Sequence, residues 1–69
     1  MARLTRLQRS QNAHYDLRVK HRDTPGKRGD VLYRYHGNIL NMQKAKKRVL
    51  TKSERRKVFT TVRNRVYRK

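Results

Sequence analysis

The excess of positive charge is the feature that most restricts how this chain can fold. Its 69 residues include 21 lysines and arginines against four acidic residues, which gives a formal net charge of +17. Only 33% of the residues are hydrophobic, so little apolar surface is available to offset the repulsion between so many cations. We therefore expect one small basic domain, over residues 1–69, that works against a polyanion.

Several classes of protein are excluded by the composition. No apolar run approaches the roughly 20 residues needed to cross a membrane, and cysteine is absent, which excludes disulfides and thiolate metal sites. Since 69 residues leave little room for a shielded pocket, we expect neither an enzyme nor a cofactor. The N-terminal segment does not resemble a secretory signal. We expect a cytoplasmic protein of a ribosome or nucleoid, or a virion protein, and no classical secretion.

The first half of the chain predicts a β-hairpin over residues 13–36. Residues 13–20 alternate apolar and polar side chains, as a half-buried strand does. Residues 31–36 are rich in residues that favour strands. Between them, Pro25 and Gly26 favour a turn. The hairpin would carry a basic tip.

The second half predicts one or two basic amphipathic helices over residues 38–69. Asn38 is a candidate cap for the first helix, and Thr51 or Ser53 for the second. Residues 58–62 are β-branched or aromatic, so a third strand remains an alternative there. The predicted fold class is therefore α+β.

Two further expectations concern the N-terminus and the core. Residues 1–11 form a basic arm or a short helix, because leucines and arginines recur there at a spacing of three. The predicted core contains Tyr15, Leu17, Val19, Leu32, Ile39, Met42, Val49, Phe59 and Val62.

The density of basic residues predicts binding to nucleic acid. Residues 44–69 carry twelve lysines and arginines and a single glutamate, whereas an ordinary solvated surface mixes both signs. Phosphate backbones bind such a surface favourably, since each neutralised phosphate releases condensed counterions. The predicted contact residues are Arg3, Arg6, Arg9, Lys27, Arg28, Lys44, Lys47, Arg48, Lys52, Arg55, Arg56, Lys57, Arg63, Arg65, Arg68 and Lys69.

Aromatic and histidine side chains suggest two further roles. Tyr33 and Tyr35 would share one face of the second strand, where their rings could stack on exposed bases or pack in the core. His14 and Asp16 would lie close together on the first strand, but a metal site needs three or four converging ligands. We therefore predict no metal site.

These observations favour a small ribosomal-type protein that binds structured RNA by neutralising its phosphates. Other proteins of a nucleoprotein assembly could be further partners, and a membrane is not expected. One alternative is a viral or nucleoid protein that coats or condenses DNA without sequence preference. Another is a phage-type regulator that docks on a host protein. Composition alone does not separate RNA from DNA as the partner.

Overall fold

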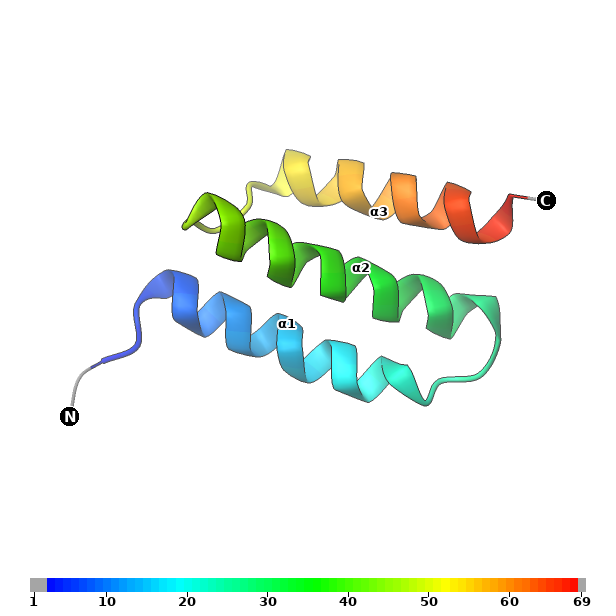
Figure 1. Ribbon diagram of the computed structural model, residues 1–69, viewed down its shortest axis with the longest axis horizontal. Coiled ribbons are helices and arrows are strands. Elements are labelled where there is room, and N and C mark those ends of the chain that lie inside the picture. The colour runs from blue at the N-terminus through cyan, green and yellow to red at the C-terminus, as the bar shows by residue number, and fades with distance from the viewer. Residues whose placement is uncertain (1–2, 69) are drawn as a thin grey trace.

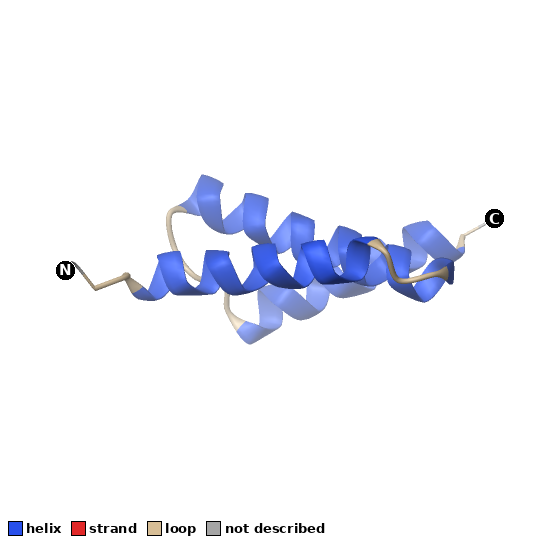
Figure 2. Cartoon of the chain, turned by 90° about the horizontal axis from the view of Figure 1, so that it is seen from below, coloured by secondary structure: helices blue, strands red, loops and turns tan. Residues whose placement is uncertain are grey.

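The computed structural model describes residues 3–68, and these residues form three α-helices joined by short loops (Figures 1 and 2). The helices are α1 (Arg6–Arg22), α2 (Gly26–Lys46) and α3 (Lys52–Tyr67). They alternate in direction, and α2 lies between the other two (Figure 1). Within the described chain, α1 packs on α2 and α2 packs on α3, whereas α1 and α3 do not pack on each other. The result is an open layer of 47 × 25 × 16 Å.

The predicted α+β fold is wrong, because the described residues contain no strand. Residues 13–36 form the end of α1, a turn and the first half of α2 instead of a hairpin. The alternating apolar residues were expected to face the core from one side of a strand, but the Tyr15 side chain is 55% exposed and the Val19 side chain is 39% exposed. The inward side of α1 follows a helical period, in which Leu7, Ser10, Leu17 and His21 are half-buried and His14 is buried. Its polar members add nothing to a hydrophobic pattern.

Capping boxes define where two of the helices begin. The Thr5 hydroxyl accepts from the Gln8 backbone N–H, and the Gln8 side chain accepts from the Thr5 N–H. Thr51 and Glu54 repeat this arrangement at the start of α3. Each box satisfies two backbone N–H groups that have no partner within the helix. The predicted cap at Thr51 is confirmed.

Other predicted boundaries of secondary structure are wrong. Asn38 lies in the middle of α2 and caps nothing. The predicted arm is folded from Arg6 onwards, as the first turns of a long helix. Residues 58–62 are helical, so the third strand is wrong.

The turn between α1 and α2 depends on two glycines. Gly26 has a φ of 82°, in the left-handed region. In a turn with proline at the first central position, the second central residue takes such a positive φ, which glycine adopts readily. The predicted turn at Pro25 and Gly26 is therefore confirmed, although it joins helices. Gly29 packs against Thr24 so closely that an added Cβ would lie 2.7 Å from the Thr24 carbonyl carbon.

The core is small and partly polar. Its buried apolar side chains are Val31, Ile39, Leu50 and Val62; of the predicted core residues, Ile39 and Val62 are confirmed as buried and Tyr15 and Val19 are wrong. Gln43 is fully buried, and its Oε1 accepts from the Ser10 hydroxyl at 3.1 Å and from the Leu50 N–H at 3.3 Å. This amide ties α1 and the α2–α3 loop to the central helix. No helix in residues 3–68 has the length and apolar character to cross a membrane.

Candidate nucleic-acid interface

The predicted basic residues lie on all three helices and their connections. Lys69 lies outside the described residues, and every other member of the predicted set is exposed. The set therefore does not gather on α3 alone. It extends from Arg3, before α1, to Arg68, after α3.

Few of these cations have a carboxylate partner. Glu54 accepts two hydrogen bonds from Arg48, at 2.8 and 3.0 Å, and lies 3.9 Å from the Lys46 ammonium. The Arg48 guanidinium, with the Thr51 N–H, lowers the pKa of Glu54 to about 2. Arg48 is thus the one predicted contact residue that forms an ion pair within residues 3–68. Most of the positive charge is left for an external anion.

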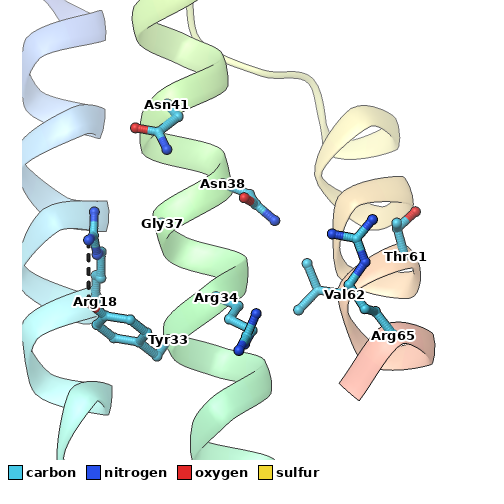
Figure 3. A pocket seen from close by; sticks show the side chains of 9 residues that line it. All are labelled: Arg18, Tyr33, Arg34, Gly37, Asn38, Asn41, Thr61, Val62 and Arg65. Atoms are coloured by element: carbon cyan, nitrogen blue, oxygen red, sulfur yellow. Dashed lines mark hydrogen bonds between the residues drawn. The ribbon is translucent and has the colours of Figure 1, made fainter. Parts of the chain in front are cut away.

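A central groove runs over α2 and touches all three helices (Figure 3). Its cavity volume is about 230 Å³. The lining residues are Arg18, Tyr33, Arg34, Gly37, Asn38, Asn41, Thr61, Val62 and Arg65. The groove exists because α1 and α3 flank α2 without closing over it, and because Gly37 places no side chain on this face.

Arg18 reaches into the groove from α1 and was not among the predicted contact residues. Its guanidinium lies 5.1 Å from the centre of the Tyr33 ring and donates to the Tyr33 hydroxyl at 3.3 Å. Its side chain passes over Gly37, where an added Cβ would lie 3.4 Å from Arg18 Cδ. The place of Arg18 in the groove could not be predicted while residues 13–20 were expected to form a strand.

The remaining groove residues come from α2 and α3. Arg34 is paired with Asp30 at 2.9 Å, one helical turn away. Arg65 is the groove residue that belongs to the predicted contact set. In Figure 3 its guanidinium lies on the α3 side of the groove, at the level of Asn38. The two asparagines were missed because they are uncharged.

The two tyrosines proposed for base stacking do not share a face. Tyr33 contacts Arg18 of α1, whereas the Tyr35 ring packs edge-on against Phe59 of α3 at 5.3 Å. Tyr35 also contacts the His36 ring at 4.8 Å. Both tyrosines are half-buried. The shared strand face on which the stacking hypothesis depended is absent, because both residues lie on α2.

A cluster of histidines lies between α1 and α2. The Nδ1 atoms of His14 and His36 are 3.0 Å apart, and the His21 ring stacks on His36 at 5.6 Å. Burial lowers the pKa of His14, and it lowers the pKa of His36 to about 4 with help from the neighbouring histidines. In the described part of the chain, no group of three or more potential ligands is placed to hold a metal ion.

Comparisons of the chain with protein-family models, with curated protein sequences and with solved structures found no match. Its chemistry must therefore be inferred from its own residues. The groove offers guanidinium groups, two amides and the Thr61 hydroxyl beside a small apolar floor. Guanidinium groups bind phosphates, and amides carry both hydrogen-bond donors and acceptors.

Proposed function

We propose that this chain is a non-enzymatic nucleic-acid-binding protein, with structured RNA as its favoured partner. The observation that carries this proposal is the exposure of the basic residues on all three helices, with four acidic residues in the whole chain. Such a layer can contact phosphates on both faces and along its edges. It would act within a nucleoprotein particle by neutralising phosphates where RNA segments meet.

The open arrangement of the helices supports RNA over an extended DNA duplex. The groove over α2 is a concave, irregular site, whereas coating a duplex requires a surface that repeats along it. Structured RNA presents loops and bulges whose unpaired nucleotides can enter such a site. Self-association along duplex DNA, measured as cooperative binding, would favour the DNA-coating alternative.

The salt dependence of binding tests the proposal. If eight to ten basic side chains touch phosphates, the logarithm of the association constant should fall against the logarithm of salt with a slope of roughly −6 to −9. Fluorescence anisotropy with a labelled RNA hairpin between about 50 and 300 mM NaCl measures this slope. A slope shallower than about −2 would contradict the proposal, because few phosphates would then be neutralised. The same titration with poly-glutamate separates nucleic acid from a generic polyanion.

A further inference from the structure

The central groove contains an arginine that is fixed in place without a neutralising partner. Arg18 is half-buried, its guanidinium is held by the Tyr33 ring and hydroxyl, and it makes no ion pair within residues 3–68. A flexible surface arginine would lose side-chain entropy on binding an anion. Because Tyr33 and the bare backbone at Gly37 already position Arg18, little of that entropy remains to be lost.

The floor of the groove, which α2 forms, carries two uncharged amides beside Arg34. Asn38 and Asn41 lie between Arg18 and α3, both exposed, and neither side chain hydrogen-bonds to a described residue (Figure 3). An amide carries two donors and an acceptor. A phosphate would use only the donors, whereas the edge of a nucleobase presents donors and acceptors side by side.

The groove continues towards an apolar hollow between α2 and α3. This second hollow has a cavity volume of about 390 Å³, and it shares both asparagines, Thr61, Val62 and Arg65 with the groove. Met42 and Val58 add apolar surface to its lining. A volume of this size falls within the roughly 300–1,000 Å³ of small-molecule sites, and an apolar floor beside amides suits the flat face of a base.

We propose that the groove binds an unpaired nucleotide, with the base held between Asn38 and Asn41 and the adjoining phosphate held by Arg18 or Arg65. This inference rests on the proposed function and deepens it, because it selects single-stranded segments of RNA over paired ones. Paired bases in an A-form helix are stacked inside the duplex, so they expose only their edges. They cannot enter a concave site on a protein surface.

Two neutral substitutions test the site without changing the charge. The Asn38→Ala, Asn41→Ala double variant keeps the net charge of +17, and both positions are exposed and helical, where alanine favours the helix. The matched control is Asn12→Ala, on the exposed side of α1 and outside the groove. Circular dichroism confirms that both variants keep the fold.

Affinity for single-stranded RNA should fall about tenfold in the double variant, since each lost hydrogen bond weakens binding roughly two- to tenfold. The control should stay within about twofold, and the double variant should bind an RNA duplex of equal length as the unmodified chain does. Equal single-strand affinities for the double variant and the control would overturn the inference while leaving the proposed function intact. So would tighter binding of the duplex than of the single strand by the unmodified chain. Absence of steep salt-dependent binding to either RNA would instead overturn the proposed function.

Discussion

At the scale of single residues, the buried histidine pair makes stability depend on pH. Two Nδ1 atoms 3.0 Å apart require one ring to donate and the other to accept. If both rings were protonated, both Nδ1 atoms would carry a hydrogen, so the hydrogen bond would be lost and two cations would lie side by side. Arg55 and His21 add positive charge nearby. His36 therefore stays neutral in the folded chain down to a pKa of about 4, whereas an unfolded histidine takes up a proton near its ordinary 6.5.

The pH prediction follows from this difference in pKa. Between those two values the unfolded chain binds more protons, so the free energy of unfolding should fall by about 1–2 kcal/mol between about pH 7 and pH 5. Urea unfolding at the two pH values measures this change in the free energy of unfolding. The His36→Gln variant should lose most of this dependence. Glu54 does not interfere, because its stabilising contribution is lost as the pH falls from its ordinary pKa of 4.5 to its folded pKa of about 2, which lies below pH 5. A pH-independent free energy of unfolding would contradict the buried neutral pair.

At the scale of the elements, the close contact of α2 with the preceding turn gives a prediction with a matched control. Gly29→Ala should destabilise the fold by about 1–3 kcal/mol, because the new Cβ would collide with the backbone of Thr24. Gly37→Ala, eight residues along the same helix, meets only the Arg18 side chain, at 3.4 Å or more, which is an ordinary van der Waals distance. It should be neutral or stabilise by up to about 1 kcal/mol, since alanine favours helices over glycine. Thermal melts of both variants compare them, and equal effects would contradict this packing.

The elements also show what could be predicted from the sequence. The cap at Thr51, the turn at Pro25 and Gly26, and the burial of Ile39 and Val62 follow from local chemistry, and the structure confirms them. The hairpin was wrong because the side-chain hydrogen bonds of α1 with α2 come from Ser10, His14 and Arg18, and the leucines on that side are only half-buried. Hydrophobic periodicity detects apolar faces only, so a helix buried through histidine and serine looks like a strand when its few apolar residues alternate.

The candidate site was predictable only in part, for a related reason. Basic residues can be recognised from their type alone, and all described lysines and arginines except the half-buried Arg18 are exposed, as a charged surface requires. The groove instead depends on which side chains converge across α2, and convergence follows from helix pairing. Arg18 and Asn38 come together only if residues 13–20 and 38–41 are both helical. The wrong secondary structure expected for residues 13–20 therefore concealed their convergence.

At the scale of the whole molecule, the net charge of +17 acts on an open layer in which four apolar side chains of residues 3–68 are buried. The layer measures 47 × 25 × 16 Å. At about 10 mM salt the Debye length is about 30 Å, so nearly every cation repels most of the others. At about 150 mM it is about 8 Å, and only close neighbours repel. Screening should therefore stabilise the folded chain.

Salt should thus raise stability while it lowers affinity for RNA, and these opposite signs distinguish self-repulsion from phosphate binding. We expect the melting temperature at about pH 7.5 to rise by roughly 5–10 °C between about 10 and 150 mM NaCl, which corresponds to about 1 kcal/mol for a domain of this size. Circular dichroism melts of the free chain measure this rise. RNA added at low salt should raise the melting temperature as well, because a ligand of the folded state stabilises it. If salt left the melting temperature unchanged, the repulsion would be the same in the unfolded chain, and charge would shape binding but not the stability of the layer.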